Sequence, residues 1–159
     1  MKLNEITQPN KPLYVSRKLL NAKELYLWAK LQGWDKPLKP EDMHVTVVSS
    51  KDPINWTRLT PQTNTLIVKP INAAVKIFGE NKNSAVFTFE CSELHARWQQ
   101  FLDIGASWDH GAYTPHVSLT YNHGYIDQDL DTMPMFFGDL ILGPEIYEDL
   151  NLDWSANKN

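Results

Sequence analysis

Two short segments that share one residue pattern constrain this chain more than any other feature. They read HVTV at residues 44–47 and HVSL at residues 116–119, so each has a histidine, an apolar residue, a hydroxyl residue and a second apolar residue. Because side chains two apart on a β-strand face the same side, each segment predicts a strand with an imidazole and a hydroxyl on one face. The fold must bury the apolar face of both strands and leave the histidine face accessible.

The segments before the two histidines follow one plan. Residues 12–19 alternate apolar and polar side chains as a half-buried strand does, and residues 84–90 are rich in β-branched and aromatic residues. Each of these predicted strands is followed by residues with the apolar spacing of a helix. The two halves of the chain therefore have the same order of elements.

Residues typical of helix ends mark both helices. Asn21 is the expected N-cap of the first helix and Gly33 its end, and Ser92 and Gly105 have the same places in the second. From N-cap to motif histidine is 23 residues in the first half and 24 in the second. The match indicates a repeat of architecture rather than of residues.

More strands are expected after each motif. Residues 66–70 and 73–79 are strand-like, and the latter should form a hairpin with residues 84–90. In the second half, residues 136–142 and 146–152 are predicted as two strands joined by a turn at Gly143-Pro144. The fold class is therefore α+β, with two β-α-β-β lobes, roughly residues 12–72 and 73–152, in a single domain over residues 1–159.

Composition excludes several classes of protein. The net charge of −4 argues against a protein that tracks long DNA or RNA by its phosphates. No apolar segment has the length of a membrane span or the form of a signal peptide, and Cys91 is the only cysteine. We therefore expect a cytosolic protein that neither enters membranes nor forms intrachain disulfides.

The charge is distributed unevenly along the chain. Residues 1–82 hold 13 Lys and Arg against 7 Asp and Glu, whereas residues 83–159 hold 2 against 12. Two interpretations stay open: the halves attract each other, or the basic half holds a small phosphorylated ligand. In the second case, Arg17, Lys18 or Lys76 would contact the phosphates.

The doubled motif is suited to acid–base chemistry on a phosphate. Two imidazoles in one groove, His44 and His116, can act as a proton acceptor and a proton donor near neutral pH. The hydroxyls of Thr46 and Ser118 can donate hydrogen bonds to phosphate oxygens. This chemistry requires no metal or other cofactor, and which histidine is acid and which is base stays open.

Two other interpretations of the histidines are weaker. The motif histidines could be partly buried groups with a structural role. A zinc site from His110, His116, His123 and Asp109 is conceivable, but its spacing matches no standard ligand pattern.

With these motifs, the chain resembles the 2H phosphoesterase superfamily, which includes RNA 2',3'-cyclic phosphodiesterases and 2'–5' RNA ligase-like proteins. The segments KPLYVSRKL, MHVTVVSSKDPINW and GASWDHGAYTPHVSLTY resemble one group within it, the phage anti-CBASS nucleases. The resemblance implies a bilobal, pseudo-symmetric fold with two mostly antiparallel sheets around a central groove and helices outside.

The resemblance also implies an activity, namely metal-independent hydrolysis of a 3',5' phosphodiester in cyclic di- and trinucleotides, the immune signals of CBASS defence. The ribose 2'-OH would be the first nucleophile. We expect a monomer that binds a cyclic di- or trinucleotide, does not bind long nucleic acid, and acts in the host cytoplasm if the chain comes from a phage.

Four further residues are candidates for binding such a substrate. Tyr14 and Tyr147 alternate with core residues on their strands, so their rings could stack on bases or cover the core. Glu145 could accept hydrogen bonds from a base edge, and Lys18 could contact a phosphate.

Two other functions remain open on sequence alone. One is a housekeeping enzyme that acts on RNA ends, although the acidic second half argues against a groove for an RNA tail. The other is a protein that sequesters a nucleotide without cleaving it, although such a protein would not need paired proton-transfer groups.

Overall fold

The computed structural model describes residues 10–79, 83–124 and 126–150. Within them lie α-helices α2 (Ala22–Gln32) and α3 (Ser92–Asp103), short 3₁₀ helices η1 (Pro40–Asp42) and η2 (Trp56–Arg58), and seven strands. The strands are β1 (Lys11–Leu19), β2 (His44–Ile54), β3 (Leu66–Val68), β4 (Ile71–Phe78), β5 (Ser84–Glu90), β6 (His116–Thr120) and β7 (Leu140–Asp149). None of the described helices is long and apolar enough to span a bilayer.

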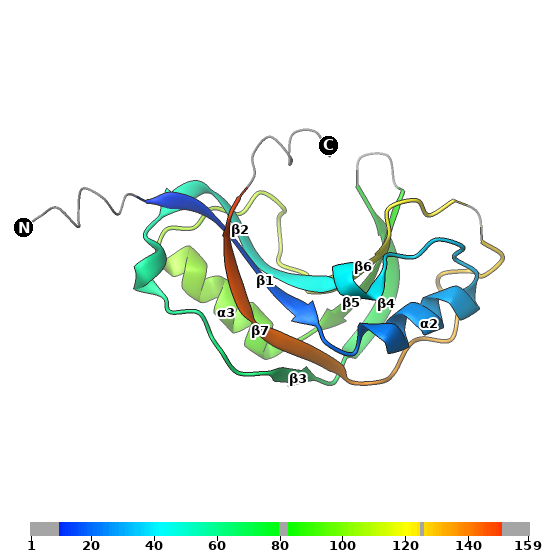
Figure 1. The fold of residues 1–159 in the computed structure, drawn as a ribbon. Coiled ribbons are helices and arrows are strands. Elements are labelled where there is room, and N and C mark those ends of the chain that lie inside the picture. Colours follow the sequence, from blue (N-terminus) through cyan, green and yellow to red (C-terminus); the bar gives the residue numbers. More distant parts are fainter. Residues whose placement is uncertain (1–9, 80–82, 125, 151–159) are drawn as a thin grey trace, which may run out of the picture.

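The seven strands form one curved sheet in the order β3-β7-β1-β2-β6-β5-β4 (Figure 1). Its recorded pairings are all antiparallel. The predicted class, mostly antiparallel strands with two helices, is confirmed, as is the hairpin of β4 and β5. The expectation of two separate sheets is wrong, because β2 and β6 pair in the middle and join the two halves.

The last strand departs from the prediction. Instead of two strands with a turn at Gly143-Pro144, β7 is one strand that runs through both residues. The pairing of β7 with β1 shifts register between Arg17 and Leu19, so the Gly-Pro pair is absorbed as an irregularity in the ladder. As a result β7 lies between β1 and β3, beside strands of the first half. The last two residues of the expected strand 146–152 lie outside the described residues.

The helix ends agree with the sequence only in part. Gly33 ends α2 with a φ of +117°, a left-handed conformation that favours glycine. Asn21 precedes α2, but its side chain binds the β7 region: Oδ1 accepts from Ile141 N at 3.0 Å and Nδ2 donates to Asp139 O at 2.8 Å. Ser92 is the first helical residue of α3 rather than its N-cap, a position held by Cys91.

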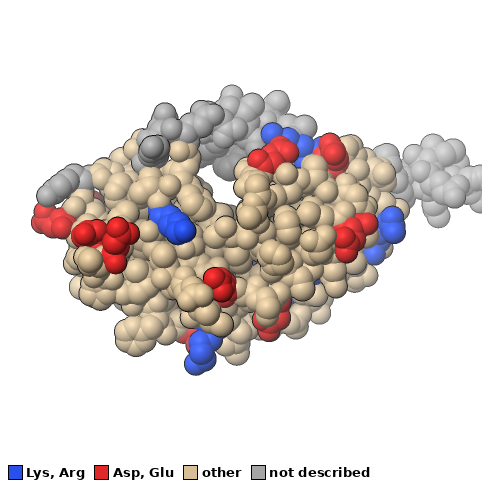
Figure 2. Space-filling view, turned by 180° about the vertical axis from the view of Figure 1, so that it is seen from behind, with Lys and Arg blue, Asp and Glu red and all other residues tan. Residues whose placement is uncertain are grey.

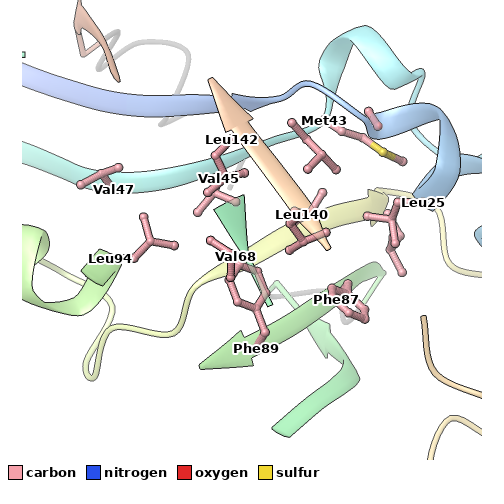
Figure 3. Close-up of a cluster of buried hydrophobic side chains, with 14 of the residues drawn as sticks. Leu25, Met43, Val45, Val47, Val68, Phe87, Phe89, Leu94, Leu140 and Leu142 are labelled. Atoms are coloured by element: carbon pink, nitrogen blue, oxygen red, sulfur yellow. The ribbon is translucent and has the colours of Figure 1, made fainter. Parts of the chain in front are cut away.

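The core lies on one face of the sheet, where both helices pack. Figure 3 shows part of this cluster, with buried side chains from four strands and both helices, among them Val45, Val47, Val68, Phe87, Phe89, Leu140, Leu142, Leu25 and Leu94. Burial of each such side chain stabilises the fold by about 1.5–3 kcal/mol. The opposite face carries the motif histidines and is left open.

Candidate active site

The two motif strands are neighbours in the sheet. β2 and β6 pair antiparallel, with Val45 opposite Val117. By the register of an antiparallel pair, each motif histidine then faces the hydroxyl residue of the other motif, and His44 and His116 are diagonal neighbours. Diagonal Cα atoms lie about 7–8 Å apart, which leaves room for a phosphate between the imidazoles.

Both imidazoles are oriented in the same way. His44 Nδ1 lies 2.9 Å from the carbonyl oxygen of Asp42, and His116 Nδ1 lies 2.8 Å from that of Thr114. A carbonyl oxygen only accepts hydrogen bonds, so Nδ1 carries a proton and donates in both histidines. The atom that gains or loses a proton is therefore Nε2 in each.

Tyr14 of β1 contacts the first motif through its hydroxyl. This oxygen lies 2.9 Å from His44 Nε2 and 2.7 Å from Thr46 Oγ1. Burial raises the pKa of Tyr14 to about 12, so the phenol keeps its proton near neutral pH. Tyr14 is therefore a hydrogen-bonded member of the first motif rather than a freely exposed ring.

His116 has a more apolar environment. The ring of Phe78 packs edge-on against its imidazole, with centroids 5.3 Å apart. Burial lowers the pKa of His116 below its ordinary value, the hydrogen bond to Thr114 opposes this, and the nearby His44 and His110 lower it further. The neutral form of His116 is thus favoured.

A groove of about 1240 Å³ runs over this face of the sheet. It is lined by both histidines and both hydroxyl residues of the motifs, together with Tyr14 and Lys18. Of the eight candidate site residues, these six lie together around one open space.

The other two candidates, Tyr147 and Glu145, do not line the groove among the described residues. On β7 the groove is lined by Ile146 and Glu148, which pair with Ser16 and Tyr14 of β1, and by Asp149 at the end of the strand. The prediction that Tyr147 and Glu145 face the groove is therefore wrong by one residue. The pairing of β7 with β1 turns the neighbouring side chains toward the groove instead.

Tyr147 and Glu145 instead join a buried network behind the sheet. Glu145 is 6% exposed and forms a double hydrogen bond with Arg97, with both distances 2.9 Å. The Tyr147 hydroxyl donates to Leu59 O at 2.8 Å and accepts from Arg97. Both side chains are used to hold α3 and the segment before β3 against β7.

Of the three cations expected to contact phosphates, the structure places only one at the groove. Arg17 is 1% exposed and donates to Gly143 O, Asn64 O and Gln62 Oε1 at 2.7–2.9 Å, so it does not face the groove. Burial lowers the pKa of Arg17, and Glu145 opposes that shift. Lys76 is exposed but lies outside the lining residues, and Lys18 is the one Lys or Arg among the described residues that line the groove.

The described lining of the groove has more acidic than basic side chains. Four carboxylate residues line it, namely Glu41, Asp42, Glu148 and Asp149. On the face seen in Figure 2, the Lys and Arg side chains of the described residues are interspersed with Asp and Glu rather than gathered in one patch. A polyanion that needs a continuous basic track is therefore poorly matched to the groove, whose described lining has four carboxylates and one lysine.

Phe78, Trp108 and His110 are among the groove residues that the sequence did not indicate as substrate-binding candidates. Trp108 and His110 lie in the loop before the second motif, and their rings contact each other edge-on with centroids 4.9 Å apart. Because that loop leads directly into the strand of His116, its position in the sequence could have indicated that its side chains reach the groove. Phe78 could have been found from the hairpin, since it pairs with Ser84, which also lines the groove.

The zinc alternative is not supported by the arrangement of side chains. Within residues 10–79, 83–124 and 126–150, no group of three or more His, Cys, Asp or Glu is placed to hold a metal ion. His123 accepts a hydrogen bond from Trp34 Nε1 at 3.0 Å and does not line the groove with His110 and His116.

Comparison with known proteins identifies the family. The family model described as "Anti-CBASS protein Acb1" matches residues 11–157. This chain belongs to the anti-CBASS protein Acb1 family. The match includes both histidine motifs and every strand of the sheet.

Curated members of the Acb1 family occur in phages and bacteria. The Acb1 protein of Vibrio phage KVP40 is 31% identical over 163 residues, which cover 100% of both chains. That of Escherichia phage RB16 is 30% identical and covers 78% of this chain and 70% of its own. An Acb1 protein of Caulobacter sp. (strain RHG1) is 36% identical over 94% of this chain, but this chain spans only 24% of its length, as it does for the Sphingomonas paeninsulae relative.

Proposed function

We propose that this protein is a metal-independent phosphodiesterase of the 2H type that hydrolyses 3',5' linkages of cyclic di- or trinucleotide immune signals. By removing these signals it would let a phage evade CBASS defence in the host cytoplasm. The observation that carries the proposal is the pairing of Val45 with Val117, which sets two imidazoles and two hydroxyls around one groove. The name that the relatives share, anti-CBASS protein Acb1, supports the biological setting.

The groove residues divide the reaction between proton transfer and phosphate binding. One imidazole removes the proton of the ribose 2'-OH, whose oxygen attacks the neighbouring phosphorus. The other imidazole protonates the departing 5'-oxygen. Thr46 and Ser118, diagonal to each other across the strand pair, donate to the non-bridging oxygens and hold the phosphate between Nε2 of His44 and Nε2 of His116.

The size and charge of the groove favour a small ring over a polymer. Its volume of about 1240 Å³ exceeds the roughly 300–1,000 Å³ of ordinary small-molecule pockets, as a ligand with two or three nucleotides requires. One lysine among four carboxylates suits a ligand with few phosphates. The acidic side chains can accept hydrogen bonds from the amino groups of bases.

An assay of the purified chain in EDTA tests the proposal. The substrates are cyclic dinucleotides, cyclic trinucleotides and RNA with a 2',3'-cyclic end, and the products are identified by mass spectrometry. We expect a cyclic oligonucleotide to be linearised at the same rate with and without EDTA. Loss of activity in EDTA that a divalent metal restores would contradict the metal-independent mechanism.

The same assay separates the alternatives. Turnover of the RNA end alone would favour an RNA-end enzyme. Binding of a cyclic oligonucleotide without turnover would favour a protein that sequesters it. Because the chain is about a quarter as long as two of its relatives, the assay should be made on this chain itself.

A further inference from the structure

The two motif histidines differ in what surrounds the nitrogen that exchanges its proton. His44 Nε2 contacts a hydroxyl that itself contacts a second hydroxyl, that of Thr46. The structure records no side-chain hydrogen bond to His116 Nε2 among the described residues, and the ring of Phe78 packs against that imidazole. The site is therefore symmetric in its motifs but asymmetric in its proton environment.

The hydrogen bonds around Tyr14 can reverse direction. When His44 is neutral, its Nε2 accepts from the Tyr14 hydroxyl, whose oxygen then accepts from Thr46. When His44 is protonated, Nε2 donates to the Tyr14 oxygen and Tyr14 donates to Thr46 Oγ1. Both states are fully paired, and the bond from the imidazolium is the stronger because the donor is charged.

We propose that Tyr14 is a positioning residue that holds the proton of His44, so that His44 is the general acid and His116 the general base of ring opening. This inference rests on the proposed function and assigns roles within it. The Tyr14 hydroxyl also fixes the direction of His44 Nε2, toward the groove and beside Thr46. Among the described residues, no side-chain hydroxyl is hydrogen-bonded to His116 Nε2, and the imidazole lies against the ring of Phe78, an environment that disfavours a charged imidazolium.

Each proton in the proposed step has a donor and an acceptor. The 2'-O–H proton passes to His116 Nε2, the 2'-oxygen forms a bond to phosphorus, and the bond from phosphorus to the 5'-oxygen breaks. The proton on His44 Nε2 turns from the Tyr14 oxygen to that 5'-oxygen and passes to it. The neutral Nε2 then accepts from the Tyr14 hydroxyl, and Thr46, whose single hydroxyl proton is donated to the phosphate during the step, donates to Tyr14 only afterwards. The product has a 2',3'-cyclic phosphate at one end and a 5'-hydroxyl at the other.

Other titratable groups face this site and contribute to any pH profile. They come from every element around His44: Tyr14 and Lys18 on β1, Glu41 and Asp42 on η1, His116 on β6, Glu148 and Asp149 on β7, and His110 and Tyr121 from the loops. The tests below therefore compare variants under one set of conditions.

A substrate with a sulfur leaving group separates the two roles. The probe is 3',3'-cyclic GMP-AMP in which sulfur replaces the 5'-bridging oxygen of one linkage, because a thiolate departs without a proton. We expect His44→Ala to lose about 10²-fold or more in kcat on the oxygen substrate and to return to within about tenfold of the wild type on the sulfur substrate. His116→Ala should be impaired on both.

The outcomes are distinct. Rescue of His116→Ala but not of His44→Ala would reverse the assignment, and rescue of neither would also overturn it. If the wild type cleaves neither probe nor any other cyclic oligonucleotide, the proposed function itself fails. Cleavage of both probes by the wild type leaves the role assignment as the only point under test.

Tyr14→Phe tests the positioning role. The ring stays and the hydroxyl is lost, so we expect kcat on the oxygen substrate to fall about tenfold with KM little changed, and the alkaline limb of the rate profile to move to lower pH. Activity on the sulfur substrate should be unaffected. Tyr147→Phe is the matched control, since it removes a hydrogen-bonded phenol on the other side of the sheet. A limb that stays in place in Tyr14→Phe, or an equal loss on both substrates, would overturn the positioning role.

Discussion

Val45 lies directly opposite Val117, and this one pair of core residues joins the two histidine motifs into a single site. Both valines are fully buried. Their pairing sets His44 opposite Ser118 and Thr46 opposite His116 on the accessible face. Because packing of the valines fixes the strand register, a slip of either strand by one residue would turn the imidazole of that strand into the core.

The doubled motif predicts that both histidines are needed for turnover. His44→Ala and His116→Ala should each lower kcat by about 10²-fold or more on the natural oxygen substrate, the range for loss of a general acid or base. Thr46→Val and Ser118→Ala should cost less, because each removes only one donor to the phosphate. His95→Ala on the exposed side of α3 is the control and should keep its activity. Full activity in either motif histidine variant would contradict the mechanism.

The aromatic lining of the groove predicts a base-stacking role for Trp108. Stacking of a base on an aromatic side chain is worth about 1–3 kcal/mol, so Trp108→Ala should raise KM by about 5–150-fold. Trp56→Ala is the matched control, because Trp56 packs against Tyr147 outside the groove. Circular dichroism should show that both variants fold, since Trp108 also contacts Trp98 and Tyr113. An unchanged KM in Trp108→Ala would remove it from the site.

The environment of His116 predicts its titration. Burial lowers the pKa of His116, so its imidazole should titrate below about 6.5 when followed by NMR. Phe78→Ala admits water and should move the midpoint upward, whereas Phe137→Ala, at a side chain that is 93% exposed, should not. A midpoint at or above the ordinary histidine value in the wild type would contradict the burial argument.

The sign of the accompanying stability effect follows from the same pKa shift. Because the folded protein favours neutral His116, this group's contribution to stability is fully present above its unfolded pKa of about 6.5. The contribution falls as pH drops from that value through the lowered folded pKa. Denaturant unfolding between pH 7 and 5 should show a smaller loss for Phe78→Ala than for the wild type.

The sequence predicted the placement of the two histidine motifs better than the course of the last strand. His44 and His116 could be placed because period-two patterning is local and each motif is preceded by a similar helix. Tyr147 could not, since whether it faces the groove depends on the pairing of β7 with β1 and on the irregularity at Gly143-Pro144. Arg17 was misplaced for a related reason: only the folded sheet shows that a charged residue has buried partners.

The buried pair of Arg97 and Glu145 predicts a large effect on stability. Arg97→Met leaves the carboxylate of Glu145, whose side chain is 0% exposed, without its salt-bridge partner and with only the hydrogen bond from Gln62 N, so the free energy of unfolding should fall by about 3–5 kcal/mol. The double variant with Glu145→Met should be less destabilised than Arg97→Met alone, because the buried carboxylate is removed together with its partner. Lys11→Met is the control: it breaks an exposed pair with Asp149 at 3.9 Å and should cost about 0–1 kcal/mol. Equal denaturation midpoints for Arg97→Met and Lys11→Met would show that the buried pair is not important.

The proposed mechanism makes its sharpest prediction on the substrate rather than on the protein. The groove offers imidazoles and hydroxyls but no thiol among the described lining residues, so the simplest nucleophile is the 2'-OH already attached beside the phosphorus. A cyclic dinucleotide with 2'-deoxyribose at the cleaved linkage should therefore bind and stay intact, whereas the ribose parent should yield a 2',3'-cyclic phosphate or, after water attacks it, a 3'-phosphate. Competition by the deoxy analogue against the ribose substrate measures its binding, and mass spectrometry of parallel reactions measures cleavage. Rapid cleavage of the deoxy analogue, or a 5'-phosphate on the first product of the ribose substrate, would show that water attacks directly and that the neighbouring hydroxyl plays no part.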